Sequence, residues 1–209
     1  MVKGIGLLGG TFDPIHIGHL RSAIEVAQRL DLIQVSLIPN AVPPHRSPPV
    51  ASGKQRLLMI QLATKYHALL DDEECELVRT GPSYTIETVQ LFRQRYPDRP
   101  LYWIMGSDAF QQIDSWYQWQ QLLSYCHIVV LMRPESRLHL QPNLKEWCQQ
   151  HQATAQASDD LYGSIMFLEL TQLAISSSMI RQILKQQHSA AFLVPEPVLS
   201  VIEQLQLYQ

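Results

Sequence analysis

The sequence lacks the long apolar segments of a membrane protein. No run approaches the roughly 18 consecutive apolar residues that a membrane-spanning helix requires. The first residues, MVKGIGLLGGTFDP, include a short apolar stretch, but Thr11, Asp13 and a histidine pair follow where a signal peptide would place small residues before its cleavage site. Neither a membrane span nor export is predicted, and we expect the protein to be cytoplasmic.

Cysteine is scarce and scattered. The three cysteines, Cys75, Cys126 and Cys148, are odd in number and form no CxxC pair. This spacing favours neither a disulfide framework nor a zinc site. We expect free thiols in a reducing compartment, and we predict no metal held by protein ligands alone.

An excess of positive charge is also missing. Lysine and arginine total 16 against 19 acidic residues, which gives a formal net charge of −3. No basic block with interleaved aromatics is present, so nothing in the composition attracts nucleic acid or an acidic membrane surface. We predict neither partner, and any anionic ligand must bind at a local site. The sequence leaves the oligomeric state open.

Short apolar runs alternate with stretches of helical periodicity along the chain. The length of 209 residues suits one domain, and no linker rich in glycine or serine divides it. Alternating strands and helices predict a parallel sheet with crossover helices. We therefore expect a single α/β domain over residues 1–209, with a Rossmann-like parallel sheet and helices on both faces.

The same patterns give approximate element positions. Strands are predicted at residues 4–8, 35–38, 76–78, 101–105, 128–132 and 165–168. Helices are predicted at residues 20–30, 57–69, 84–95, 117–125, 177–186 and 196–206, with a short one at 144–148. Two stretches break the rhythm: 39–53 carries five prolines, and 133–164 is polar and rich in glutamine. The first is a candidate substrate loop and the second a surface excursion.

A glycine-rich loop follows the first predicted strand, in the sequence GGTFDPIHIGHL. A helix N-terminus concentrates unpaired N–H groups and partial positive charge, so it is a favourable place for phosphate. His16 and His19 lie three residues apart and could both face that pole, where imidazoles stabilise charge developing at a phosphorus. The alternative is structural: His19 caps the helix and His16 packs under the loop.

Other phosphate and metal motifs do not fit this loop. It satisfies neither GxxxxGKS nor GxGxxG, and HxxH without the zincin glutamate or a third nearby ligand is a poor metal site.

The loop resembles a known signature. GTFDPIHIGHL is similar to the motif of the HxGH nucleotidyltransferases, and the extended form with GGTFDP and HIGHL resembles bacterial nicotinate mononucleotide adenylyltransferases most closely. In that family the two histidines contact ATP phosphates and the glycine-rich turn lies against the nucleotide. The resemblance assigns these contacts to Gly9, Gly10, Thr11, Phe12, His16 and His19.

A second motif near the C-terminus, ISSSMIR, places hydroxyls at a predicted helix start and an arginine one turn later. Alone, these residues are more typical of a helix cap and a solvated or paired surface arginine. The family resembled carries a motif of the form IS-small-T-x-IR that contacts ATP phosphates, which implies this role for Ser176, Ser178 and Arg181. Ser178 replaces the usual threonine and keeps the hydroxyl.

Three further segments, PPHR, PSYT and SWY, recur in the same order in that family. There, two backbone amides bind the nicotinate carboxylate and an indole stacks on the pyridine. The resemblance implies that Thr85 and Tyr117 supply the amides and Trp116 the stacking face. It places the mononucleotide phosphate near Asn40, His45 and Arg46. Taken singly, each aromatic residue is more readily assigned to the core.

Residues that end two later strands complete the implied ATP site. Gly106 and Asp108 follow one predicted strand, where a ribose could be hydrogen-bonded, and Arg133 follows the next. The family uses the equivalent residues around ATP. A helix cap is the alternative role of Asp108.

The resemblance as a whole implies a transferase of NAD biosynthesis. It would move AMP from ATP to nicotinate mononucleotide, with His16, His19 and Arg181 as catalytic residues and Mg²⁺ carried by the ATP phosphates. The rivals are an enzyme for nicotinamide mononucleotide or phosphopantetheine and a nucleotide-binding sensor without turnover. A tRNA synthetase is disfavoured by the length and by the missing KMSKS-like segment.

Overall fold

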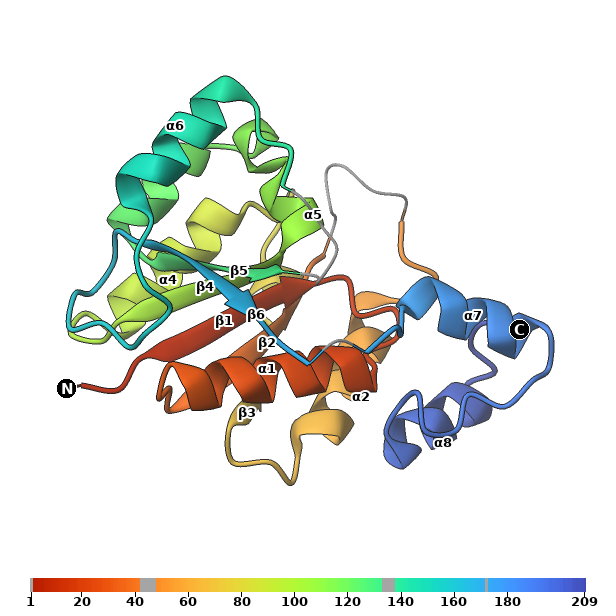
Figure 1. Ribbon diagram of the computed structural model, residues 1–209. Helices are drawn as coiled ribbons and strands as arrows, with labels where there is room; N and C mark the ends of the chain where they lie inside the picture. The colour runs from red at the N-terminus through yellow and green to blue at the C-terminus, as the bar shows by residue number, and fades with distance from the viewer. Residues whose placement is uncertain (1, 42–47, 133–137, 172) are drawn as a thin grey trace.

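A parallel sheet forms the centre of the molecule (Figure 1). The computed structural model describes residues 2–41, 48–132, 138–171 and 173–209. Its six-stranded sheet has the order β3-β2-β1-β4-β5-β6, and each neighbouring pair is parallel. The chain runs outward in one direction from β1 and in the other from β4, which is the doubly wound Rossmann arrangement. The predicted fold class is confirmed.

The element bounds are as follows. The strands are β1 (Ile5–Gly10), β2 (Gln34–Pro39), β3 (Leu70–Asp72), β4 (Leu101–Gly106), β5 (His127–Met132) and β6 (Ile165–Glu169). The α-helices are α1 (Ile17–Arg29), α2 (Gly53–Thr64), α3 (Cys75–Val78), α4 (Thr85–Arg95), α5 (Ser107–Phe110), α6 (Pro142–His151), α7 (Ser177–Lys185) and α8 (Glu196–Gln204). Two 3₁₀ helices are η1 (Ile113–Ser115) and η2 (Trp119–Ser124).

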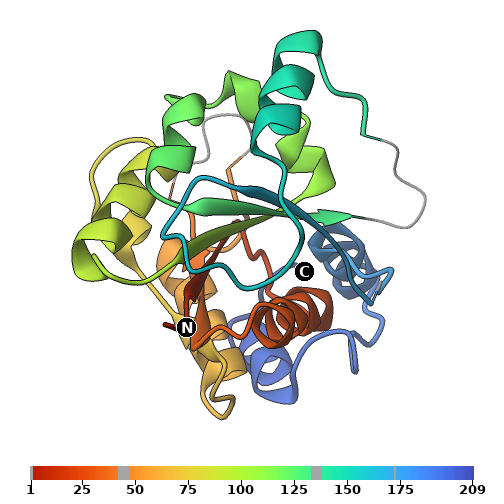
Figure 2. The same ribbon diagram turned by 60° about the vertical axis from the view of Figure 1, so that its left-hand side comes forward.

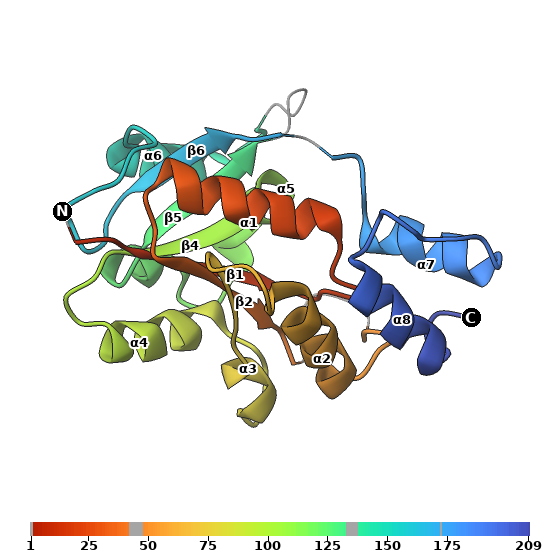
Figure 3. The same cartoon turned by 90° about the horizontal axis from the view of Figure 1, so that it is seen from below.

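Helices cover both faces of the sheet (Figures 1 and 2). Helices α4, α5 and α6 lie over one face, and α1 and α2 lie over the other, which Figure 3 presents from below; α8 packs on α2. Side chains alternate between the faces along each strand, so Leu7 and Trp103 join one buried cluster while Leu8 and Ile104 join the other. The strands are therefore apolar on both sides, as buried parallel strands are.

The predicted strand at 76–78 is wrong, because these residues lie in the short helix α3. The edge strand is β3, six residues earlier, which pairs Leu70 with Val35. Only Leu70 of this strand is buried, and the acidic Asp71 and Asp72 follow it. An edge strand with so little apolar character gives no alternating pattern of apolar and polar residues, so it was not predicted. The apolar residues of α3 have the pattern of a short strand, so α3 was predicted as one.

Two helix predictions also need correction. Helix α2 begins at Gly53, earlier than predicted, because Ser52 and Gln55 form a capping box. The predicted helix at 117–125 is the 3₁₀ helix η2, preceded by Gln118 in the left-handed region at φ 52°. The remaining predicted helices are present, including α6, whose Leu144, Trp147 and Cys148 are buried within the supposed surface excursion.

The cysteines are buried and free, and burial raises the pKa of Cys75 and Cys126 to about 12. Among the helices of the described residues, none has the length and apolar character needed to span a membrane.

Close packing of β1 against β4 yields the first prediction. A Cβ at Gly9 would lie 2.7 Å from two carbons of the Trp103 indole ring, which is itself buried. Gly9→Ala should lower the free energy of unfolding by about 1 to 3 kcal/mol, because the ring has nowhere to move. Urea unfolding measures this change.

The matched control is Gly106→Ala, because a Cβ there meets no atom within 4 Å. Equal losses of stability in the two variants would contradict the packing explanation.

Candidate active site

The loop between β1 and α1 brings the two histidines together at the carboxyl end of the central strands. His16 is the N-cap residue of α1, and its carbonyl accepts a hydrogen bond from the His19 N–H at 3.0 Å. The imidazole rings stack with centroids 3.6 Å apart and an interplanar angle of 23°. His19 is the third residue of α1 and not its N-cap, so the alternative role of His19 as the helix cap is wrong; His16 is buried, as that alternative also expected.

Both imidazoles are neutral at pH 7. Burial lowers the pKa of His16 to about 4. The pKa of His19 is well below its usual value because of burial and, secondarily, because of the neighbouring His16. A neutral imidazole keeps one N–H donor, so the pair can donate hydrogen bonds without carrying charge.

Several buried polar atoms of this loop lack a partner. The Nδ1 atoms of His16 and His19 and the Oγ1 atom of Thr11 make no hydrogen bond within the described chain. An unsatisfied buried polar atom costs about 1 to 3 kcal/mol, so native proteins rarely keep three of them in one loop. Their grouping indicates a ligand site.

Small residues allow the aromatic rings of the loop to approach the backbone. Phe12 is buried in the left-handed region at φ 49°, and its ring meets His19 edge-on at 5.0 Å between centroids. A Cβ at Gly10 would lie 2.9 Å from the Phe12 ring, and one at Gly18 would lie 3.0 Å from Nδ1 of His16. Glycine at both positions therefore fixes the placement of the rings.

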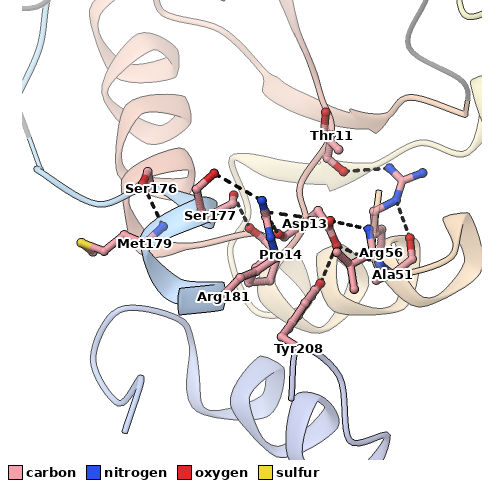
Figure 4. Close-up of polar contacts among 12 residues, drawn as sticks. Thr11, Asp13, Pro14, Ala51, Arg56, Ser176, Ser177, Met179, Arg181 and Tyr208 are labelled. Atoms are coloured by element: carbon pink, nitrogen blue, oxygen red, sulfur yellow. Dashed lines mark hydrogen bonds and ion pairs between the residues drawn. The ribbon is translucent and has the colours of Figure 1, made fainter. Parts of the chain in front are cut away.

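The second motif docks on the first, from the far end of the chain (Figure 4). Ser177 Oγ donates to the Pro14 carbonyl at 2.9 Å. Arg181 Nη1 donates to the Asp13 carbonyl at 2.7 Å, and Nη2 donates to Ser178 Oγ at 3.3 Å. Ser176 caps α7 by accepting a hydrogen bond from the Met179 N–H. The fold thus brings the two motifs into direct contact.

A buried charged network, which the sequence analysis missed, supports this junction (Figure 4). The Arg56 guanidinium donates to the carbonyls of Thr11 and Asn40, each at 2.7 Å, and to that of Ala51 at 3.3 Å. Arg56 is 1% exposed and Asp13 4%. Asp13 belongs to the GTFDP motif, which is a sequence signal that it has a special role. Arg56 lies in an ordinary helical stretch, and no sequence signal marks it as buried.

The segments GPSYT and SWY also meet. Thr85 is the first residue of α4, where backbone N–H groups have no partner inside the helix. The Tyr84 and Tyr117 rings contact each other with centroids 4.8 Å apart. Trp116 packs partly against the buried cluster of that sheet face, while Tyr117 is 54% exposed. The structure thus brings Thr85, Trp116 and Tyr117 to one region.

Ser83 joins this region to the end of β2. Its hydroxyl accepts a hydrogen bond from the Ala41 N–H at 2.9 Å and bonds the Glu76 carboxylate. Glu76 is buried, which raises its pKa, and it accepts a second bond from Thr88 Oγ1 at 2.7 Å. Beside Ala41, the Oδ1 atom of Asn40 is buried without a partner within the described chain.

The remaining predicted residues lie at the ends of β4 and β5. Gly106 ends β4 and precedes α5, with open space beside its Cα, and Asp108 lies in the first turn of α5. His45, Arg46 and Arg133 lie outside the described residues. Within the described part of the chain, no cluster of three or more His, Cys, Asp or Glu side chains could hold a metal ion.

The fold and this site define a nucleotidyltransferase. Residues 7–183 match a family model described as cytidylyltransferase-like. The chain is 43% identical over 211 residues to a probable nicotinate-nucleotide adenylyltransferase of Pseudomonas aeruginosa, with 100% of this chain and 99% of the relative covered. A probable nicotinate-nucleotide adenylyltransferase of Methylococcus capsulatus is 42% identical over 98% of this chain and 99% of its own. This chain belongs to the nicotinate-nucleotide adenylyltransferase family.

Solved structures agree on the fold. The nicotinic acid mononucleotide adenylyltransferase of Plasmodium falciparum, complexed with NaAD, superposes with a TM-score of 0.74 over 99% of this chain and 97% of that one, at 16% identity. A putative nicotinate-nucleotide adenylyltransferase from Vibrio parahaemolyticus gives 0.66 at 15% identity, covering 99% of this chain and 95% of that one.

The lowered histidine pKa predicts how stability depends on pH. Above pH 6.5 His16 is neutral in both states; between pH 6.5 and about 4 the unfolded chain binds a proton that the folded protein does not. The free energy of unfolding should therefore fall as pH falls through this window, by about 2 kcal/mol at about pH 5 from His16 alone. His19 adds to the loss in the same direction.

Chemical denaturation across this pH range measures the effect. His16→Asn should flatten the dependence, whereas His188→Asn, at an exposed position, should leave it unchanged. An unaltered slope in His16→Asn would show that the buried histidine does not carry the effect.

Proposed function

We propose that this protein transfers the AMP moiety of ATP to nicotinate mononucleotide, giving nicotinate adenine dinucleotide and pyrophosphate in NAD biosynthesis. A phosphate oxygen of the mononucleotide forms a bond to the α-phosphorus of ATP. The bond from that phosphorus to the bridging oxygen breaks, and its electron pair leaves with pyrophosphate. The observation that carries this proposal is the stacked pair of His16 and His19 at the N-terminus of α1. Their buried Nδ1 atoms have no hydrogen-bond partner within the described chain, and Arg181 is docked beside them.

Catalysis in this proposal comes from positioning and charge stabilisation. His16 and His19 donate hydrogen bonds to the phosphates as neutral groups, and Arg181 supplies positive charge. The N-terminus of α1 adds its partial positive charge. The backbone and side chains against the nucleotide are those of Gly9, Gly10, Thr11, Phe12, Ser176 and Ser178.

Magnesium belongs to the substrate in this proposal. In the described part of the chain no three-ligand carboxylate or histidine group is available, and the Asp13 carboxylate is occupied by three hydrogen-bond donors. The ATP phosphates are proposed to carry the ion, which would neutralise charge on the leaving pyrophosphate. Gly106 and Asp108 would bind the ribose, and Arg133, outside the described residues, would lie nearby.

The acceptor site favours the acid over the amide. The backbone amides of Thr85 and Tyr117 are proposed to donate to the nicotinate carboxylate, and Trp116 to stack on the pyridine. A carboxamide would turn its own N–H₂ towards one of these donors and leave it unpaired, at a cost of about 1 to 3 kcal/mol. Asn40, with His45 and Arg46, is proposed to surround the mononucleotide phosphate.

The direct test is pyrophosphate release from MgATP with nicotinate mononucleotide, run beside nicotinamide mononucleotide and phosphopantetheine. We expect the highest kcat/KM with the acid form. His19→Ala should lower kcat by about 100-fold or more, because it removes a donor that acts on developing charge. His188→Asn serves as the control on an exposed histidine.

Two outcomes would overturn this proposal. ATP binding without turnover of any acceptor would indicate a nucleotide-binding sensor. Faster turnover with nicotinamide mononucleotide would contradict the proposed amide donors.

The Ser83 link makes a separate prediction about the acceptor. Ser83→Ala leaves the Ala41 N–H without its acceptor and removes one donor from buried Glu76. The segment after β2 and the segment before α4 are then no longer joined by this hydrogen bond. Because both segments are proposed to bind nicotinate mononucleotide, KM for this substrate should rise about fivefold while KM for ATP changes little. Steady-state kinetics with each substrate varied in turn measures both constants.

Ser200→Ala is the matched control, since that hydroxyl is exposed and donates to the Glu196 carbonyl within α8. A parallel rise in both KM values for Ser83→Ala would assign Ser83 to general folding instead.

A further inference from the structure

Arg181 lies beside a buried carboxylate but does not form a close ion pair with it. Nη1 of Arg181 is 3.9 Å from Oδ2 of Asp13. The same nitrogen donates a hydrogen bond of 2.7 Å to the main-chain carbonyl of Asp13. An arginine next to a carboxylate usually makes two parallel hydrogen bonds at about 2.7 to 2.9 Å. Something in the structure prevents that pairing.

The Asp13 carboxylate is already occupied by neutral donors (Figure 4). Oδ2 accepts from the Val50 N–H at 2.8 Å, and Oδ1 accepts from the Ala51 N–H at 3.1 Å. Oδ1 also accepts from the Tyr208 hydroxyl at 2.7 Å, across 195 residues of sequence. These donors already satisfy both carboxylate oxygens, so the guanidinium gains little by turning towards them.

The charges of the network point the same way. Burial lowers the pKa of Arg56, and the nearby Asp13 opposes that shift, so the two buried charges compensate each other. The guanidinium of Arg56 is engaged with three carbonyls. Among these three charged residues Arg181 therefore supplies the net positive charge, and it is 31% exposed.

Tyr208 is built into this network. It is the next-to-last residue of the chain, 7% exposed, and follows α8, which packs on α2. Burial, then the hydrogen bond to Asp13, raises its pKa, so its hydroxyl stays protonated and remains a donor. Its backbone adopts the left-handed region at φ 66°, which a tyrosine rarely does without a compensating contact.

We infer that Tyr208 is a positioning residue for the ATP phosphates: its hydroxyl occupies the Asp13 carboxylate and thereby leaves the Arg181 guanidinium free to bind phosphate. This inference rests on the proposed function for the assignment of the phosphates to Arg181. In the absence of the hydroxyl, Oδ1 loses its shortest hydrogen bond, and the carboxylate can turn to accept from Arg181, whose Nη1 lies 3.9 Å from Oδ2.

Tyr208→Phe tests this role with little change in shape. KM for ATP should rise about fivefold while KM for nicotinate mononucleotide stays within about twofold. A purely structural loss would lower the folded fraction, and so the apparent kcat, without moving either KM. Tyr66→Phe, at a tyrosine that is 86% exposed, is the matched control. An unchanged KM for ATP in Tyr208→Phe would overturn the inference.

A double-mutant cycle tests whether the effect passes through Arg181. In the Arg181→Ala background, Tyr208→Phe should change KM for ATP by less than about twofold, because there is no guanidinium left to divert. Full additivity of the two substitutions would overturn the inference even if each alone raises KM.

ATP titration calorimetry on the same four proteins separates this inference from the proposed reaction. If wild type binds ATP but turns over no acceptor, the proposed function fails. The role of Tyr208 can still be tested, because it requires Tyr208→Phe to weaken ATP binding in wild type and to have little effect in the Arg181→Ala background.

Discussion

The burial of Arg56 is the constraint on which the rest of the site depends. Its guanidinium lies inside the protein and reaches three separate segments: the loop after β1 at Thr11, the end of β2 at Asn40, and the residue Ala51 before α2. A charge in such a place costs several kcal/mol unless hydrogen bonds and an opposite charge compensate it. Backbone carbonyls and the nearby Asp13 provide that compensation, so the three segments must keep the positions that supply it. The need to compensate the buried Arg56 charge therefore shapes the loop between β1 and α1 as much as the glycines of that loop do.

Burial of the two histidines also explains why the loop offers neutral hydrogen-bond donors, next to the charged Arg181. A site that stabilises a phosphoryl transfer needs donors already oriented in a place with little water. Burial keeps His16 and His19 neutral, so they offer N–H groups without repelling each other across the 3.6 Å stack. Arg181 carries the charge, at the more open edge of the network. In the proposed function the loop after β1 would orient the hydrogen-bond donors, and Arg181 on α7 would supply the positive charge.

Local pattern explains what the sequence made predictable. The sheet followed from alternating apolar runs, and the histidine pair and ISSSMIR followed from short motifs that resemble those of a known family. The edge strand β3 escaped because two of its three residues are acidic, and α3 was mistaken for a strand because its apolar residues are adjacent. Arg56 and Tyr208 escaped for a different reason. Their partners lie up to 195 residues away, and nothing in the local sequence distinguishes them from a solvated arginine and a terminal tyrosine.

The two substrate regions meet at the short segment that follows β2. The Asn40 carbonyl accepts from Arg56, and its N–H donates to the Gly10 carbonyl, so this residue belongs to the nucleotide network. One residue later, the Ala41 N–H donates to Ser83 and joins the acceptor network of Glu76. A shift of the residues in either network would therefore move the peptide that joins Asn40 to Ala41, and with it the other network. In the proposed function this peptide would set the relative position of the two reacting phosphates, because in-line transfer tolerates little error in their separation.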